Sequence, residues 1–321
     1  MATKETTSSG SSEFFEEIGD VELPEPAASL ADDYERLFDD RDRFLWRWIY
    51  SLFPAFTLSS VAAADERHVR TQKTVLTMYV TVLDDLIENH DDRATFEEAC
   101  RLVHDPEAVE PSRAEVDPEQ FAFIEDCWRT FEDGIEDAPR YDEFADIMAY
   151  DMRQTTNAMD YSAVVNQNPR IANLSGSRRY GAHNMVMFPY ADVDLMYSPG
   201  FELADFSALR DLLWDLQELA RIGNWLTTWE REVQEGDFTA GIVTHAIQQG
   251  IVTPTDLEES PHEVVERIKR HDVEQRFRDR WEQQYRDVQT REFDTESIDL
   301  HNLVDGMETV FEYHLASRGY K

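Results

Sequence analysis

Apolar residues recur with the period of an α-helix along almost the whole chain from about residue 30. The strongest example is residues 62–90, where the ten residues from Thr74 to Leu83 include no charged side chain. A helix that is uncharged on every face must be buried among other helices. Sustained alternation of apolar and polar residues, which marks a half-buried strand, is absent from the sequence. The sequence therefore predicts an all-α protein.

The architecture we expect is a single-domain α-helical bundle of about ten helices. Residues 1–28 are polar and acidic and include the segment Pro-Glu-Pro, so we predict a flexible acidic tail there. No linker divides residues 29–321, which we predict to form one domain. Pro54 is expected to interrupt or end the first helix. The expected helices are residues 31–53, 62–90, 119–134, 140–165, 174–190, 204–234, 238–249, 262–290 and 296–317, with a loop at 105–118.

The charge of the chain limits its partners. It holds 67 acidic against 30 basic residues, which gives a formal net charge of −37. Nucleic-acid phosphates and anionic lipid surfaces repel such a chain, so we expect neither as a partner. Only four of the basic residues are lysines. An acidic surface so poor in lysine is typical of proteins that work in molar salt, where charges are screened within ~3 Å. We therefore expect a halophile, and more specifically a halophilic archaeon, as the source.

Other features of the composition predict a cytoplasmic protein without a membrane span. No stretch approaches the ~18 consecutive apolar residues that a membrane helix needs. The first 20 residues hold no apolar signal-peptide core. The two cysteines, Cys100 and Cys127, make no disulfide framework and suit a reducing compartment. Because 41% of the residues are hydrophobic, the chain has enough apolar surface to build a core.

Three carboxylates end the uncharged helix. Asp84, Asp85 and Glu88 form the pattern Asp-Asp-x-x-Glu, in which Asp84 and Glu88 are one turn apart on the same face. Such oxygens can bridge Mg²⁺ ions. In a chain this acidic, a pattern of three acids is expected roughly three times by chance. The position of this one gives it weight, because acids that follow a buried segment lie at the mouth of a core.

A second polar constellation lies in the helix expected at 204–234. Asn224, Thr228 and Glu232 are spaced four residues apart, which keeps the three side chains on one face of the helix. An amide oxygen, a hydroxyl and a carboxylate can together hold a divalent cation. The pattern is expected only about 0.1 times by chance from the composition, so it is the stronger of the two signals. A solvent-facing polar stripe is the alternative, and the neighbouring tryptophans Trp225 and Trp229 argue against it.

Together and in this order on an all-α chain, the two patterns resemble the metal-binding motifs of the class I terpene synthases. The pattern that begins at Asp84 is similar to the aspartate-rich motif of that family, and the pattern that begins at Asn224 is similar to its second metal motif. The 140 residues between these positions are of the order that the family shows. The family often has Asp directly after the asparagine, where this chain has Trp225.

The resemblance implies a fold, a cofactor and a reaction. It implies the α-helical bundle of the class I terpenoid synthases over residues 29–321. It implies that three Mg²⁺ ions, or Mn²⁺ in their place, ionise a linear prenyl diphosphate, with C20 or C15 chains favoured. The carbocation would cyclise to a terpene hydrocarbon or alcohol, in an enzyme that is a monomer or homodimer. The metal ligands implied are Asp84, Asp85, Glu88, Asn224, Thr228 and Glu232.

The resemblance also implies an arginine that senses the diphosphate, about 46 residues before the second motif. Arg178 and Arg179 occupy this position. The planar guanidinium suits the role because it can donate two parallel hydrogen bonds to phosphate oxygens. Gly181 and Ala182 resemble the helix break beside that arginine, where a backbone carbonyl faces the substrate. The family more often has an acidic residue at the position of Gly181.

Further candidates follow from the same resemblance. Arg231, within the second motif, would also bind diphosphate. The family ends with an Arg-Tyr pair that caps the diphosphate, and this chain has Arg318 and Tyr320 with one residue between them. A basic residue on a frayed terminal helix is the equal alternative for Arg318. Candidate walls for an apolar pocket, each of which is also a candidate for ordinary core, are Phe53, Tyr79, Tyr161, Met187, Phe188 and Trp214.

Three alternative functions remain open from the sequence. Another prenyl-diphosphate enzyme on the same fold would be a chain-elongating synthase or a squalene- or phytoene-type synthase, for which Asp211 and Asp215 give the spacing Asp-x₃-Asp. A His-Asp metal phosphohydrolase would use the pairs that begin at His90 and His271. A helical binding protein without enzymatic activity is the third.

Overall fold

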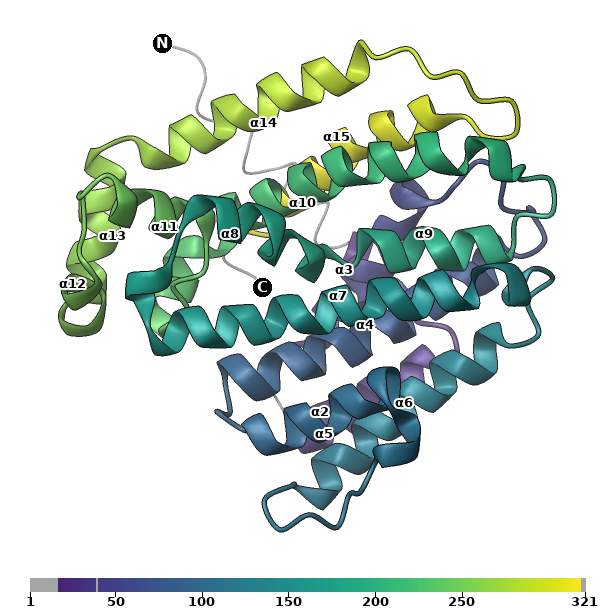
Figure 1. Ribbon diagram of the computed structural model, residues 1–321, viewed down its shortest axis with the longest axis horizontal. Coiled ribbons are helices and arrows are strands. Elements are labelled where there is room, and N and C mark those ends of the chain that lie inside the picture. The colour runs from purple at the N-terminus through teal and green to yellow at the C-terminus, as the bar shows by residue number, and fades with distance from the viewer. Residues whose placement is uncertain (1–16, 39, 319–321) are drawn as a thin grey trace.

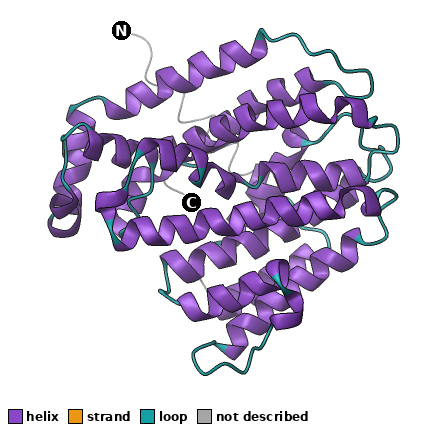
Figure 2. Cartoon of the chain, viewed as in Figure 1, coloured by secondary structure: helices purple, strands orange, loops and turns teal. Residues whose placement is uncertain are grey.

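The structure is a computed structural model that describes residues 17–38 and 40–318. Within these ranges it contains helices, turns and loops and no strand, which confirms the all-α prediction (Figures 1 and 2). No helix in the described part of the chain is long and apolar enough to cross a membrane. The α-helices are α2 (Ala27–Leu37), α3 (Arg43–Leu52), α4 (Glu66–Glu88), α5 (Arg93–His104), α6 (Pro118–Ile135), α7 (Tyr141–Gln167), α8 (Leu174–Arg179), α9 (Met187–Met196), α10 (Phe206–Glu235), α11 (Gly241–Gln248), α12 (Pro254–Glu259), α13 (Pro261–Arg270), α14 (Val273–Gln289) and α15 (Leu300–Ala316). Short 3₁₀ helices are η1 (Phe53–Phe56), η2 (Pro106–Ala108), η3 (Pro169–Ile171), η4 (Gly181–Met185) and η5 (Leu203–Asp205).

Helices α4 and α10 organise the bundle. Helix α4 contains the uncharged segment Thr74–Leu83 and packs against α3, α5, α6, α7 and α9, and its residues Leu76 and Leu83 are fully buried. Helix α10 packs against α9, α11, α14 and α15. Helices α4 and α10 therefore belong to different sides of the bundle, with α7 and α9 between them in Figure 1. This separation leaves room for a cavity between the helices that carry the two motifs.

A close approach at Gly306 places α15 against the short helix η1. A Cβ atom at this position would lie 1.8 Å from the carbonyl oxygen of Ala55, so no other residue fits there. Helix η1 follows α3 directly, since Pro54 supplies no N–H for a longer α-helix. The predicted interruption at Pro54 is therefore confirmed, and the contact brings η1, α3 and α15 together at one end of the cavity.

Three helices predicted as continuous are divided in the structure. The segment 31–53 forms α2 and α3, because Asp42 caps the N-terminus of α3 by accepting a hydrogen bond from the backbone N–H of Phe44 at 2.7 Å. The segment 262–290 forms α13 and α14, which meet at Asp272 in the left-handed conformation. The segment 174–190 is divided near Gly181. Helices α5 and α12 are additional to the prediction.

The predicted boundary between an acidic tail and the domain at residues 28 and 29 is wrong. Helix α2 begins at Ala27, which is fully buried. Ile18 is also buried within the core, and Arg47 donates a hydrogen bond to the carbonyl oxygen of Gly19. Residues 17–28 therefore pack on the bundle, because Ile18 supplies an apolar anchor within an otherwise polar segment. Residues 1–16 lie outside the described part of the chain.

Candidate active site

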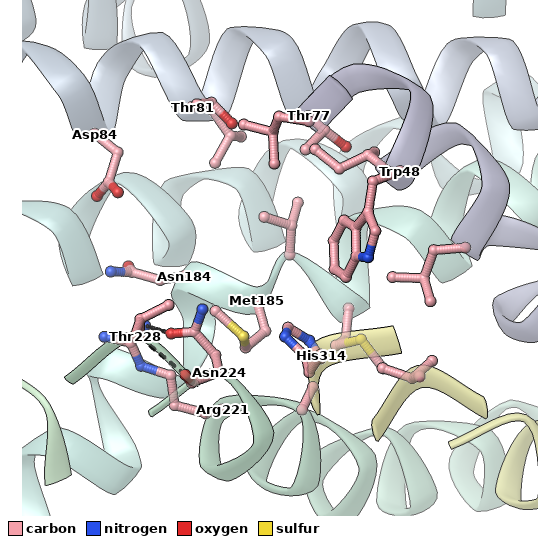
Figure 3. A pocket seen from close by; sticks show the side chains of 18 of the residues that line it. Trp48, Thr77, Thr81, Asp84, Asn184, Met185, Arg221, Asn224, Thr228 and His314 are labelled. Carbon is pink, nitrogen blue, oxygen red and sulfur yellow. Dashed lines mark hydrogen bonds between the residues drawn. The ribbon is translucent and has the colours of Figure 1, made fainter. Parts of the chain in front are cut away.

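A cavity with a volume of about 240 Å³ lies between helices α4 and α10. Its lining comes from α3, η1, α4, α7, η4, α9, α10 and α15, so it occupies the centre of the bundle. Figure 3 shows Asp84 of α4 facing Asn184 of η4, with Asn224 and Thr228 of α10 on the opposite wall. One end of the cavity is polar and the other is apolar and aromatic.

The polar end unites the two motifs. Asp84 and Glu88 line it from α4, and Asn224, Thr228 and Glu232 line it from α10. Each set lies on one face of its helix because its members are spaced three or four residues apart. The Thr228 hydroxyl donates to the backbone carbonyl of Asn224 at 2.8 Å, and the oxygen keeps its lone pairs for another partner. Five of the six predicted metal ligands therefore line the polar end of one cavity.

The carboxyl groups at this end hold their protons more tightly than usual. Burial, together with the neighbouring carboxylates, raises the pKa of Asp84 to about 6 and that of Glu88 well above its usual value. Burial and the charge of Asp237 raise the pKa of Glu232 to about 7. Asp237 also lines the cavity, although no local sequence pattern marks it. Four carboxyl groups thus repel one another in a partly desolvated space.

This group of residues fits a divalent cation. Carboxylate, amide and hydroxyl oxygens are the hard ligands that Mg²⁺ takes in proteins, and a cation would relieve the repulsion that raises the carboxyl pKa values. The amide oxygen of Asn184, which lines the cavity, is buried without a hydrogen-bond partner. In the described part of the chain, no group of three or more His, Cys, Asp or Glu side chains is placed to hold a metal ion. A cation at this end of the cavity would therefore take amide and hydroxyl oxygens as well as carboxylates, from α4, η4 and α10.

Asp85, the sixth predicted ligand, lies outside the cavity lining and is fully buried. Its oxygens accept hydrogen bonds from the Tyr34 hydroxyl at 2.7 Å, from Arg41 Nε and Nη2 at 3.0 and 2.6 Å, and from the Asn89 amide at 2.9 Å. Successive side chains of an α-helix point about 100° apart around the helix axis, so Asp85 faces α2 while Asp84 faces the cavity. Asp85 therefore positions Arg41, which does line the cavity.

The arginines inside the cavity differ from most of those predicted. Arg231 lines the polar end, as the second motif led us to expect, and Arg41 and Arg221 line it as well. Arg41 comes from the loop between α2 and α3, and Arg221 is on α10 one turn before Asn224. Neither was identified from the sequence. Arg221 had a usable signal, because its spacing from Asn224 places both on one helix face.

The other predicted diphosphate ligands that the structure describes, Arg178, Arg179 and Arg318, lie outside the cavity lining. Arg178 is held outside the cavity lining by Glu218, which accepts from Nε and Nη2 at 2.7 and 2.9 Å. Arg179 is exposed. Arg318 donates to Glu274 at 2.9 Å and also pairs with Glu230, again away from the lining. Tyr320 lies outside the described residues.

The helix break expected beside Gly181 is present. Helix α8 ends at Arg179, the chain continues as η4, and Val186 adopts the left-handed conformation with φ 57° before α9 begins. A β-branched residue in this conformation is strained, and such strain is concentrated at functional sites. The break brings residues 184–187 to the cavity, whereas Ala182 is buried outside its lining.

The apolar end takes two of the six predicted wall residues, Phe53 and Met187. The other four lie in ordinary packing. Tyr79 donates to the carbonyl of Ala99 in the core, and Phe188 packs against Trp214, which is half-exposed. Tyr161 packs against a neighbouring tyrosine. Wall residues that sequence reasoning missed are Leu45, Trp48, Ile49, Leu52, Phe56, Val80, Met185, Tyr190, Val310 and His314.

The residues of the alternative functions lie outside this cavity. Asp211 is exposed, and Asp215 forms an ion pair with Arg291 at 2.7 Å. His90 pairs with Asp40 at 2.6 Å near the surface. His271 contacts a backbone carbonyl of its own helix.

Comparison with known proteins gives no assignment, since no family model and no curated protein matches the chain.

Proposed function

We propose that this protein is a class I terpene synthase, which ionises a linear prenyl diphosphate with Mg²⁺ and cyclises the resulting carbocation. The observation that carries the proposal is the meeting of two motifs, 140 residues apart in the sequence, on facing sides of one cavity. The polar end, which is rich in carboxylates and arginines, continues into an end lined by aliphatic and aromatic side chains, and such a lining suits an apolar prenyl chain. This combination distinguishes the site from a general helical core.

The residues of the polar end would hold the cation and the diphosphate. Asp84 and Glu88 from α4 and Asn224, Thr228 and Glu232 from α10 would bind Mg²⁺, or Mn²⁺ in its place. The bound cations supply the positive charge that stabilises the departing diphosphate. Arg231 and Arg41 add hydrogen-bond donors to phosphate oxygens.

The residues of the apolar end would shape the chain and exclude water. Trp48 and Phe53 line this end, and the face of an aromatic ring can stabilise a neighbouring carbocation through its quadrupole. Thr77 and Tyr190 hydroxyls bond to each other at 2.7 Å, so this polar pair is satisfied within the wall. A wall with few free polar groups keeps water from the cation and permits ring closure.

The decisive experiment is incubation of the protein with C10 to C25 prenyl diphosphates and Mg²⁺ in molar KCl, with extracts read by gas chromatography and mass spectrometry. We expect cyclised products of the same chain length as the substrate. Asn224→Ala should abolish them, while Arg280→Gln, a change at a half-buried arginine outside the cavity lining, should not. Products of doubled or extended length would favour the related synthases instead, and undiminished product from Asn224→Ala would refute the metal assignment.

A further inference from the structure

Arg221 is a buried cation without a close counter-anion. Its side chain is 8% exposed, and it lines the polar end of the cavity. Its Nη1 donates to Asn224 Oδ1 at 3.1 Å, and its Nε is buried with no hydrogen-bond partner. Among the described residues it forms no ion pair. A buried guanidinium is ordinarily paired with a carboxylate because its desolvation is costly, so this arrangement needs a reason.

The carboxylates of both motifs surround this cation at longer range. The positive charge of Arg221 lowers the pKa of Asp84, of Glu88 and of Glu232, against the larger effect of burial. Its charge therefore reaches acids on α4 and on α10 alike, and it offsets part of their mutual repulsion. A divalent cation bound at this end of the cavity would likewise offset the repulsion between these carboxylates.

The hydrogen bond to Asn224 occupies the oxygen that the second motif offers to a cation. An amide oxygen that faces a guanidinium is a poor ligand for a divalent ion, because two positive charges would then share one oxygen. The guanidinium lies beside the helix break. A Cβ atom at Gly181 would lie 4.0 Å from Nη2 and within 4 Å of no other atom, so the glycine leaves a side-chain-sized space next to Nη2. Figure 3 shows Arg221 beside Asn224 at the edge of the cavity.

We propose that Arg221 takes the place of a bound metal ion while the site is metal-free. Its hydrogen bond to Asn224 Oδ1 then keeps this oxygen from binding a metal ion until a diphosphate draws the guanidinium away. The inference rests on the proposed function and goes beyond it, since it makes diphosphate and Mg²⁺ binding depend on each other through one side chain. Such coupling is reciprocal: diphosphate tightens Mg²⁺ binding by the same factor that Mg²⁺ tightens diphosphate binding. Arg221 is a positioning residue in this scheme.

The test is calorimetric titration with Mg²⁺ alone, with inorganic pyrophosphate alone, and with Mg²⁺ in the presence of pyrophosphate. For the wild-type protein we expect weak Mg²⁺ binding alone and much tighter binding with pyrophosphate. Arg221→Gln should bind Mg²⁺ alone about 5- to 20-fold more tightly than the wild type, and pyrophosphate should enhance that binding less by a similar factor. The matched control Arg280→Gln removes one arginine charge outside the cavity and should match the wild type.

Unchanged or weaker binding of Mg²⁺ alone by Arg221→Gln would overturn the inference. Failure of the wild-type protein to bind Mg²⁺ and pyrophosphate together would instead overturn the proposed function. If Arg221→Gln is unstable without metal, the thermal unfolding of Arg221→Gln and Arg221→Met is measured at increasing Mg²⁺ concentrations instead. Recovery of the fold by Mg²⁺ supports the inference, because the ion then replaces the missing charge, and instability at every Mg²⁺ concentration refutes it.

Discussion

The adjacent residues Asp84 and Asp85 should respond in opposite ways to the same substitution. Asp84 faces the cavity among like charges, and its pKa rises from 3.8 to about 6, which corresponds to about 3 kcal/mol. Because Asp84 is only partly buried, water in the cavity screens its charge, and we expect about 1–2 kcal/mol of this to be realised. Asp84→Asn should therefore stabilise the metal-free protein by about 1–2 kcal/mol near pH 8.

The sign of the pH dependence follows from the same shift. The folded protein binds the Asp84 proton more tightly than the unfolded chain does, so wild-type stability falls as the pH rises from about 4 to above 6. The gain from Asp84→Asn should accordingly be near zero at about pH 4 and complete at about pH 8.

Asp85→Asn should be strongly destabilising. This carboxylate is fully buried and accepts four hydrogen bonds, two of them from the Arg41 guanidinium. Removing its charge leaves Arg41, whose side chain is 15% exposed, without its partner. Breaking a buried pair in this way costs about 3–5 kcal/mol.

The assay is urea unfolding followed by circular dichroism, in molar KCl with a chelator, for both variants at about pH 5 and about pH 8. Mg²⁺ with pyrophosphate should then stabilise the wild-type protein and stabilise Asp84→Asn less, since ligand binding adds to folding stability. Loss of stability in Asp84→Asn at the higher pH, or a neutral effect of Asp85→Asn, would refute the orientation assigned to these two residues.

Three further outcomes are expected. Lys73 and Asp194 form a fully buried ion pair with Nζ and Oδ1 2.5 Å apart, so Lys73→Met should cost about 3–5 kcal/mol in urea unfolding, and the double variant Lys73→Met/Asp194→Leu should recover most of this loss. Arg231→Gln should weaken pyrophosphate binding in calorimetry about tenfold or more, whereas Arg178→Gln should change it by less than about threefold, since Glu218 holds Arg178 away from the cavity; a large loss in the latter would show that this pair opens on binding. With a net charge of −37, the protein should unfold as KCl is diluted from molar to about 0.1 M, and retention of its circular dichroism spectrum there would contradict the halophilic interpretation.

The sequence by itself determined those features that depend on neighbours along one helix. Helical periodicity and the uncharged stretch before Asp84 predicted a buried helix, and the structure has it as α4. The spacing of Asn224, Thr228 and Glu232 fixed a shared face, because residues four apart lie one above another in any α-helix. The break beside Gly181 was expected only from the family resemblance, since the periodicity by itself predicted a continuous helix over residues 174–190.

The tertiary structure alone decided which groups meet at the cavity. It selected Asp84 over Asp85, because the rotation of α4 about its axis depends on packing against the surrounding helices. It brought Arg41 to the polar end from a loop 44 residues away, and it kept Arg178 outside through Glu218, 40 residues further along the chain. Contacts between side chains so distant in sequence leave no periodic signal. The presence of Arg41 and Asp237 at the polar end therefore could not be predicted before the helices were assembled.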